Sequence, residues 1–217
     1  MDCVNRPKAC INENLYMEMA DALVVGGYRD AGYVSVHVDD CWMGRERDRA
    51  TGRLVADPSR FPSGMRNLAR YMHQRGLKFG IYENLGTVSC VGFPGSWGHL
   101  QEDANTFAEW EVDYLKFDGC FVNSALMPGV KVDYNQIGNS CNLWRNYRDI
   151  RSSWESILRI IDYYGRNQDK LIPTHGPGHW HDPDMLVIGN PGITVNMAIA
   201  QMTICLLHGT LSRVFLL

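Results

Sequence analysis

The stretch Tyr114-Leu115-Lys116-Phe117-Asp118-Gly119-Cys120 places a lysine and a carboxylate where chemistry is expected. Its composition is that of a short buried strand, and residues two apart in a strand lie on the same side. The glycine after Asp118 indicates a turn. In parallel α/β proteins, ligand chemistry collects at the carboxyl ends of strands, because loops there vary while the sheet holds the geometry. The stretch therefore predicts either a buried Lys116–Asp118 salt bridge or a working carboxylate.

Other acids also follow predicted strands, and they meet only if those strands are parallel. Aromatic side chains and an arginine flank them, and carboxylates beside ring faces are typical of a sugar site. Two such carboxyls can share the work of glycoside cleavage, one attacking or activating water while the other protonates the leaving oxygen. The acids are Asp39, Asp40, Asp118, Asp149, Asp182 and Asp184, and the flanking residues are Trp42, Tyr82, Trp144, Arg145 and Trp180. Each acid taken singly is also compatible with a helix cap or a structural salt bridge.

A metal site is the competing interpretation. His179 and His181 alternate along an extended segment, and Asp182 or Asp184 would complete a set of histidine and carboxylate ligands. No third histidine is placed nearby, and Asp182 can equally be a turn acid before a ligand acid. His37, inside a predicted strand, is interpreted as a core histidine.

The elements that position these residues alternate between helix and strand. Apolar periodicity and terminating glycines predict helices over about 12–27, 65–75 and 100–110, and strands over 33–38, 77–82 and 114–118. Three such units in series predict parallel strands with crossover helices, which is an α/β fold. Residues 121–140 interrupt this alternation of helix and strand. A strand-like run at 141–146, a helix from about 154 to 164, a last unit through 171–185 and a helix over about 195–208 follow, with no domain boundary within 1–217.

Composition narrows the function. The chain has 217 residues, 45% of them hydrophobic, and a net charge of -3. Its scattered basic residues argue against a nucleic-acid or anionic membrane partner, and no apolar run is long enough to span a bilayer. Seven cysteines suggest an oxidising compartment, although the N-terminus lacks the apolar core of a secretory signal.

Six strings along the chain resemble glycoside hydrolase family twenty-seven, the melibiase family. They are Val38-Asp39-Asp40-Cys41-Trp42, Asp57-Pro58-Ser59-Arg60-Phe61-Pro62, Leu77-Lys78-Phe79-Gly80-Ile81-Tyr82, Leu115-Lys116-Phe117-Asp118-Gly119-Cys120, Trp144-Arg145-Asn146-Tyr147, and Gly176-Pro177-Gly178-His179-Trp180 through Asp182-Pro183-Asp184-Met185-Leu186. The resemblance implies a (β/α)8 TIM barrel followed by a β domain. It also implies retaining hydrolysis of terminal α-galactosyl or α-N-acetylgalactosaminyl residues of glycoconjugates.

The resemblance further implies residue roles. Asp118 matches the family's nucleophile and Asp149 its acid/base, and retaining enzymes hold such carboxyls about 5 to 5.5 Å apart. Sugar binding falls on Asp39, Asp40, Tyr82, Lys116, Arg145 and Asp184, and disulfides are implied for Cys3–Cys10 and Cys90–Cys120. No cofactor or metal is expected. The implied partner is a carbohydrate, a homodimer is compatible with the family, and the implied compartment is lysosomal or secreted.

The chain also departs from the family's pattern. The first barrel strand, the signal sequence and the β domain are expected to be absent, as are about thirty residues between Cys120 and Cys141, roughly one strand-helix unit. Cys41 and Cys141 then lack their usual partners. The gap removes the loop that separates the two sugar specificities, although the strings at 106–110 and 141–147 lean toward the N-acetylgalactosaminidase branch. The chain is thus expected to be a partial catalytic domain, with an inactive fragment or sugar binder as the alternative.

Overall fold

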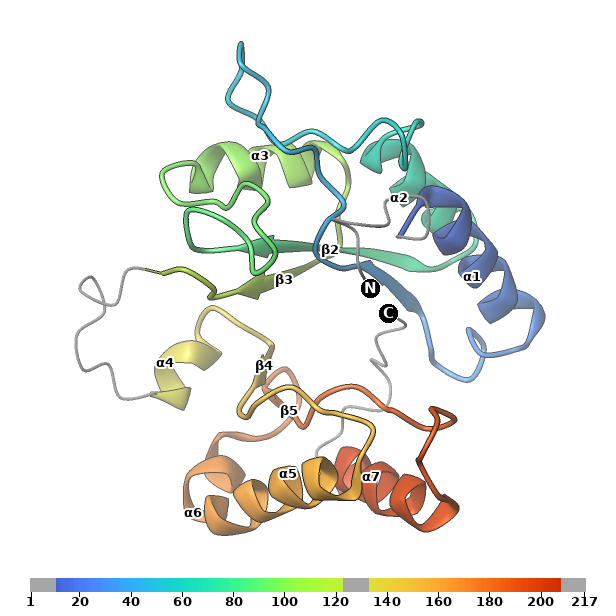
Figure 1. The fold of residues 1–217 in the computed structure, drawn as a ribbon, viewed down its shortest axis with the longest axis vertical. Helices are drawn as coiled ribbons and strands as arrows, with labels where there is room; N and C mark the ends of the chain where they lie inside the picture. The colour runs from blue at the N-terminus through green and yellow to red at the C-terminus, as the bar shows by residue number, and fades with distance from the viewer. Residues whose placement is uncertain (1–10, 123–132, 208–217) are drawn as a thin grey trace. The chain divides into compact units, whose positions relative to one another are not determined.

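The computed structural model describes residues 11–122 and 133–207, drawn in colour in Figure 1. The chain divides into two compact units, here called unit 1 (described residues 11–122) and unit 2 (described residues 133–207). Within these ranges, no helix has both the length and the apolar content needed to cross a membrane.

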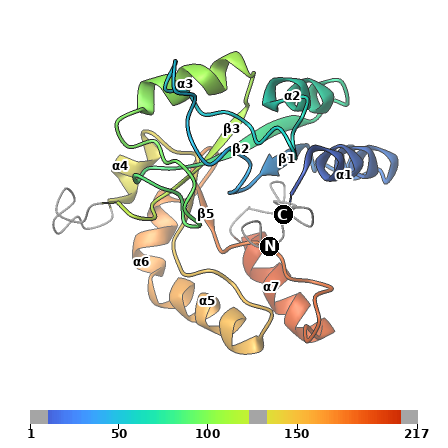
Figure 2. The same ribbon diagram turned by 45° about the horizontal axis from the view of Figure 1, so that its top comes forward.

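Unit 1 contains a parallel three-stranded sheet in the order β1-β2-β3. The elements in chain order are α1 (Glu13–Val25), β1 (Ser35–Val38), α2 (Met65–His73), β2 (Lys78–Asn84), α3 (Leu100–Glu109) and β3 (Tyr114–Asp118). All three helices lie on one side of the sheet (Figures 1 and 2). The three helix-strand units predicted from the sequence are therefore confirmed, with the parallel strands that an α/β fold requires.

Local sequence signals explain where the first helix begins and ends. The Asn12 side chain accepts a hydrogen bond of 3.0 Å from the Leu15 N–H and so caps α1. Gly26 ends the helix, and Gly27 follows with a φ of 76°, which glycine adopts at little cost. The apolar face of α2, with Leu68 and Met72, is fully buried in the core of unit 1.

One glycine of β2 makes room for a histidine of β1. His37 is paired with Gly80 across the two strands, is buried, and stacks on the Tyr114 ring at 5.5 Å between centroids. A Cβ atom added at Gly80 would lie 2.0 Å from Nδ1 of His37. His37 is thus a core histidine, as its strand position predicts, and Gly80 is required by its ring.

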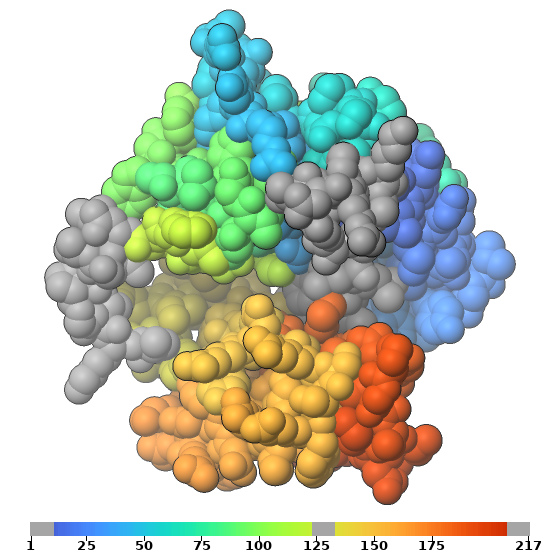
Figure 3. All heavy atoms as spheres, viewed as in Figure 1, coloured from blue at the N-terminus to red at the C-terminus, as the bar shows by residue number. Residues whose placement is uncertain are grey.

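An ion pair holds the long loop after β1, which stands out from the surface of unit 1 (Figure 3). Arg47 forms two hydrogen bonds to the Asp103 carboxylate, at 2.6 and 2.7 Å, and donates to the Gly95 carbonyl at 2.8 Å. Both partners of the ion pair are largely buried. The bonds therefore tie the projecting loop to α3 and to the glycine-rich loop after β2.

Unit 2 contains two short parallel strands, β4 (Leu143–Arg145) and β5 (Trp180–Asp182), with Arg145 opposite Asp182. Its helices are α4 (Tyr134–Gly138), α5 (Trp154–Arg166), α6 (Gln168–Leu171) and α7 (Val195–Leu207), and a 3-10 turn, η3, spans Ile172–Thr174. The strand-like run at 141–146 and the helices from about 154 and 195 are confirmed. In the last unit, residues 168–174 are helical, and the strand lies within the following His/Trp segment. The irregular stretch contains the five-residue α4.

Candidate active site

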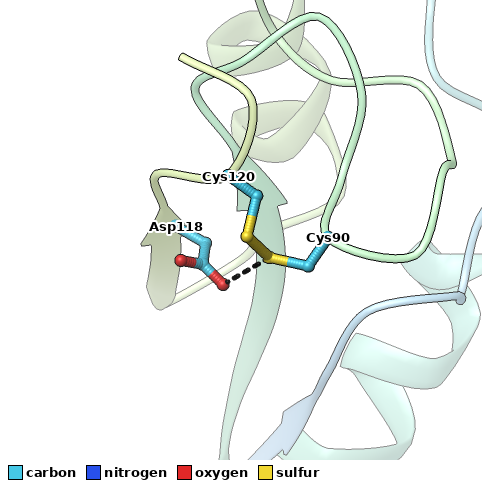
Figure 4. A group of neighbouring side chains, drawn as sticks. All are labelled: Cys90, Asp118 and Cys120. Carbon is cyan, nitrogen blue, oxygen red and sulfur yellow. Dashed lines mark hydrogen bonds between the residues drawn. A yellow bond between two sulfur atoms is a disulfide. The ribbon is translucent and has the colours of Figure 1, made fainter. Parts of the chain in front are cut away.

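Asp118 is the last residue of β3, and its carboxylate is held on both oxygens. Oδ1 accepts from the Gly119 N–H at 2.8 Å, and Oδ2 accepts from the Tyr82 hydroxyl at 3.1 Å. Figure 4 shows the side chain pointing toward the Cys90–Cys120 disulfide, with Oδ2 3.2 Å from the Cys90 sulfur. A disulfide sulfur carries no proton, so this approach is a contact without a donor. The carboxylate is thus oriented by neutral donors only.

Tyr82 lies on the neighbouring strand, where the register sets Tyr82 opposite Lys116 and Asn84 opposite Asp118. Its side chain is almost completely buried. Burial, together with the nearby charges of Asp40 and Asp118, raises the pKa of Tyr82 above its usual range. The phenol therefore stays protonated and remains a donor to Asp118.

Lys116 forms its ion pair with Asp39, with 2.6 Å between Nζ and Oδ2. The cation predicted to neutralise Asp118 is thus paired across the sheet with an acid that directly follows β1. Both side chains are partly exposed, at 35% and 25%. The pair therefore lies where polar atoms of a ligand can reach it.

Asp40 continues the acidic turn after β1. Its N–H donates to Oδ1 of Asp39 at 2.7 Å, and its own Oδ1 accepts from the Cys41 N–H at 2.6 Å. Burial raises the pKa of Asp40, and the adjacent Asp39 charge adds to the effect. Five predicted site residues, Asp39, Asp40, Tyr82, Lys116 and Asp118, thus gather at the carboxyl ends of β1, β2 and β3.

One aromatic prediction is wrong. Trp42 is fully buried and donates from Nε1 to the Tyr82 carbonyl at 2.8 Å. A buried indole offers no ring face to a ligand. Trp42 is therefore part of the core that supports Tyr82, and it cannot form the floor of a sugar site.

The predicted disulfide beside the site is present. Cys90 and Cys120 are bonded and close a loop with a sequence separation of 30 residues. Cys3 and Cys10, the other predicted pair, lie outside the described residues, whereas Cys41 and Cys141 carry no disulfide. In the described part of the chain, Cys90, Asp118 and Cys120 are the only acid, histidine or cysteine side chains clustered as metal ligands would be. Their sulfurs are already bonded to each other, so they offer no thiolate.

Unit 2 carries the remaining predicted site residues on and after β4 and β5. Arg145 bridges two acids, with 2.6 Å to Oδ1 of Asp149 and 2.5 Å to Oδ2 of Asp184. The side chain of Asp149 is 84% exposed, whereas that of Asp184 is 10% exposed. Burial of Arg145 opposes its charge, but the attraction of Asp184 and Asp149 is stronger and raises its pKa. Arg145 thus stays charged while it orients both acids.

Asp184 has an unusual backbone, with a φ of 80°, that its side chain stabilises. Oδ2 accepts from the Ile150 N–H and Oδ1 from the Met185 N–H, both at 2.7 Å, and Asp182 accepts from the Asp184 N–H at 2.9 Å. Asp182 therefore acts as a turn acid, and Asp184 carries the buried carboxylate. This is one of the two arrangements that the sequence left open.

The histidine ligand set of the competing metal interpretation is not supported. Nδ1 of His181 accepts from Trp144 Nε1 and Asn146 Nδ2, each at 2.9 Å, and Nε2 lies 3.1 Å from the Thr174 hydroxyl. Burial, with the neighbouring His175, lowers the pKa of His181 to about 4. Both ring nitrogens are thus engaged by protein groups, and His181 is a neutral core histidine.

Two residues near Asp118 were missed by the sequence reasoning. Asn84 is fully buried at the end of β2 and bonds to the Cys120 backbone, and Gly86 lies against the Cys120 carbonyl. The available signal was a polar residue ending an apolar strand, followed by a glycine-rich loop. The partner across the sheet could not be read from that signal.

Comparison with known proteins identifies relatives over most of the chain. A family model described as Alpha galactosidase A matches residues 1–130 and 125–211. The mouse alpha-N-acetylgalactosaminidase is 48% identical over 235 residues, covering 94% of this chain and 56% of its own, and human alpha-galactosidase A is 44% identical, covering 94% and 54%. The crystal structure of alpha-galactosidase I from Mortierella vinacea superposes with a TM-score of 0.72 at 28% identity, covering 85% and 57%. The chain thus spans about half the length of the curated relatives it matches.

The same comparisons locate a gap. The aligned region of 235 residues is longer than the chain itself, at 217 residues, so the relatives carry residues that this chain lacks. The two matches to the family model meet at 125–130, just after β3. This is the stretch where the rhythm of strand and helix breaks in the sequence.

Proposed function

The chain belongs to the alpha-galactosidase A family, the melibiases, and on that premise we propose that it is a retaining α-galactosidase or α-N-acetylgalactosaminidase. The substrate would be a terminal α-linked galactose or N-acetylgalactosamine on a glycolipid or glycoprotein glycan. One observation carries the proposal. Asp118, at the carboxyl end of a parallel strand, is oriented by Tyr82 and Gly119 beside the Lys116–Asp39 pair.

In the proposed reaction, Asp118 attacks the anomeric carbon, and the bond from that carbon to the leaving oxygen breaks. Asp149 gives its proton to this oxygen and then takes a proton from the water that hydrolyses the glycosyl ester on Asp118. Tyr82 stabilises the carboxylate before attack. Arg145 keeps Asp149 oriented through their 2.6 Å contact.

Sugar hydroxyls would be bound by charged groups that hold them in a fixed orientation. Lys116 on β3 offers an ammonium donor group, and Asp39 and Asp40 after β1 offer carboxylate acceptors. Arg145 and Asp184 offer a second set in unit 2. Carboxylates that accept two hydroxyl protons each distinguish sugar epimers by geometry, which suits a glycosidase.

The proposal also includes the type of α/β fold to which the chain belongs. We assign residues 1–217 to one incomplete (β/α)8 TIM barrel, a fold in which catalytic residues stand at the carboxyl ends of strands. The solved α-galactosidase from Mortierella vinacea, similar over 85% of this chain, supports this assignment. Residence in the lysosome or secretion is also proposed, because the Cys90–Cys120 disulfide suits an oxidising compartment.

The test is turnover of chromogenic α-galactoside and α-N-acetylgalactosaminide by the purified chain. Asp118→Asn should reduce kcat by at least about a thousandfold, and Asp149→Asn by a smaller factor for substrates with good leaving groups. Asp30→Asn is the matched control, because Asp30 is an exposed acid of unit 1 that pairs only with Arg29 among its described ion-pair contacts.

Rescue of activity by azide distinguishes the nucleophile from the acid/base. With Asp118→Gly, azide should restore turnover and give the β-galactosyl azide, whereas with Asp149→Gly it should give the α-galactosyl azide. Binding of galactose without turnover of either substrate would reject the enzyme and identify the chain as a sugar-binding fragment.

A further inference from the structure

The side chain of Asn84 connects two segments next to Asp118. Its Nδ2 donates to the Val88 carbonyl at 2.7 Å and to the Cys120 carbonyl at 2.8 Å, and its Oδ1 accepts from the Cys120 N–H at 2.7 Å. The side chain is fully buried. Both amide protons and the amide oxygen are therefore used inside unit 1.

The hydrogen bonds of the Asn84 side chain continue the contact between the two segments where the backbone pairing of β2 and β3 ends. The register of β2 and β3 ends with Asn84 opposite Asp118, and the chain then turns at Gly119. Beyond that turn, the Asn84 amide meets the N–H and C=O of Cys120 as a neighbouring strand would. Only a primary amide presents two donors and an acceptor in this plane, because a carboxylate has no donor and an aliphatic side chain has neither.

The neighbouring glycine shows how close the two segments lie. A Cβ atom added at Gly86 would lie 2.1 Å from the Cys120 carbonyl oxygen. The Leu85 N–H also donates to the Asp118 carbonyl at 2.9 Å. The end of β2 therefore holds the backbone of residues 118 and 120 from one side.

Asn84 joins by hydrogen bonds the same two segments that the disulfide joins covalently. Val88 lies two residues before Cys90, and Cys120 is the other half of the bridge. We infer that Asn84 is a positioning residue of this site: it holds Cys90 and Cys120 within bonding reach and keeps the Asp118 carboxylate in place.

Asn84 should therefore affect thiol–disulfide exchange at the Cys90–Cys120 bridge. Two glutathione thiols reduce the bridge, giving one glutathione disulfide and two protein thiols on Cys90 and Cys120. The equilibrium favours the bridge in proportion to the effective concentration of one protein thiol near the other. The hydrogen bonds of the Asn84 side chain hold both segments and so raise that effective concentration. Loss of these hydrogen bonds should therefore make the bridge easier to reduce.

The experiment uses the full chain and measures the glutathione redox ratio at which half of the Cys90–Cys120 bridges are reduced, here called the midpoint. The wild type and its variants are equilibrated with glutathione buffers, quenched by alkylation, and the Cys90 and Cys120 peptides are quantified by mass spectrometry. Asn84→Asp should shift the midpoint toward reduction by about tenfold near pH 7.5, because its carboxylate faces the Val88 and Cys120 carbonyls. The shift should shrink near pH 5, where protonation restores one donor. Asn84→Leu should shift the midpoint at both pH values.

Thr106→Val is the control. Thr106 is fully buried in α3, where its hydroxyl donates to the Glu102 carbonyl at 2.7 Å and accepts from Nε of Arg53 at 2.9 Å. Neither of these hydrogen bonds involves Cys120. This variant loses both hydrogen bonds and should leave the midpoint within about twofold of wild type. A midpoint for Asn84→Asp within about twofold of wild type at both pH values overturns the inference, as does an equal shift in Thr106→Val.

The effect of Asn84 on the Asp118 carboxylate rests on the proposed function and is measured separately, by enzyme kinetics. Asn84→Asp should lower kcat for the chromogenic α-galactoside by about tenfold near pH 7.5, with KM changed less than about twofold, because the nucleophile is misplaced and the sugar contacts remain. An unchanged kcat in Asn84→Asp overturns the positioning role. If the wild type turns over neither substrate, the proposed function fails, whereas the glutathione midpoint still decides whether Asn84 holds the bridge.

Discussion

The hydroxyl of Tyr82 donates a hydrogen bond of 3.1 Å to Oδ2 of Asp118, from the strand next to the one that carries the acid. The ring is buried, and its raised pKa keeps the proton on the phenol. Asp118 therefore meets a neutral donor, which orients the carboxylate without pairing it to a cation. In the proposed reaction, a nucleophile held in this way would keep its negative charge available for attack.

Tyr82→Phe should lower kcat/KM for an α-galactoside by about tenfold to a hundredfold, because it deletes a hydrogen bond to a charged acceptor and keeps the ring. Steady-state kinetics with the chromogenic substrate provide the measurement. Tyr33→Phe is the control, since the Tyr33 ring packs edge-on against Tyr28. Equal activity of Tyr82→Phe and wild type would contradict a role for the hydroxyl.

Asp184→Ala should destabilise unit 2 by about 2 to 4 kcal/mol. The change removes acceptors for two backbone N–H groups and for Arg145, and it leaves a φ of 80° that alanine adopts poorly. Asp184→Asn keeps one acceptor and a residue type that tolerates this φ, so its loss should be clearly smaller. Urea unfolding measures both, and a larger loss in the asparagine variant would refute the explanation.

The burial of Glu83 predicts that the free energy of unfolding depends on pH. Its side chain is fully buried, within the described residues Oε2 has no hydrogen-bond partner, and burial raises its pKa to about 8. The folded state therefore binds a proton that the unfolded state releases above its ordinary pKa of about 4.5. The contribution of Glu83 to the free energy of unfolding should therefore be fully present below about pH 4.5 and be lost as pH rises to about 8.

Glu83→Gln removes that titration. It should be about 2 to 4 kcal/mol more stable than wild type near pH 8 and nearly equal to it near pH 4.5. Guanidinium unfolding at the two pH values measures the difference. An identical pH dependence in the variant and wild type would show that Glu83 does not carry the effect.

Gly80→Ala should destabilise unit 1 by about 1 to 3 kcal/mol or more, because the new methyl group would lie 2.0 Å from the His37 ring. Adding His37→Ala should recover much of the loss, since two residues in contact are energetically coupled. Thermal unfolding of the single and double variants measures the coupling. Strictly additive losses would mean that the ring is not the obstacle.

The sequence alone determined the elements and the family. Apolar periodicity, terminating glycines and β-branched runs are local signals, and they placed α1 to α3 and β1 to β3 within a few residues. Motif strings placed Asp118, Tyr82 and Arg145 at strand positions that the structure shows. These features depend on neighbours in the chain, so the sequence encodes them directly.

Only the tertiary structure decided which groups contact one another. Lys116 pairs with Asp39 rather than Asp118, Trp42 is core, both nitrogens of His181 are engaged, and Asn84 holds Cys120. Each contact joins residues on different elements, and it depends on strand register and on which face packs inward. A local pattern carries neither quantity. The catalytic candidate was therefore readable from the sequence, whereas the residues that hold it in place were not.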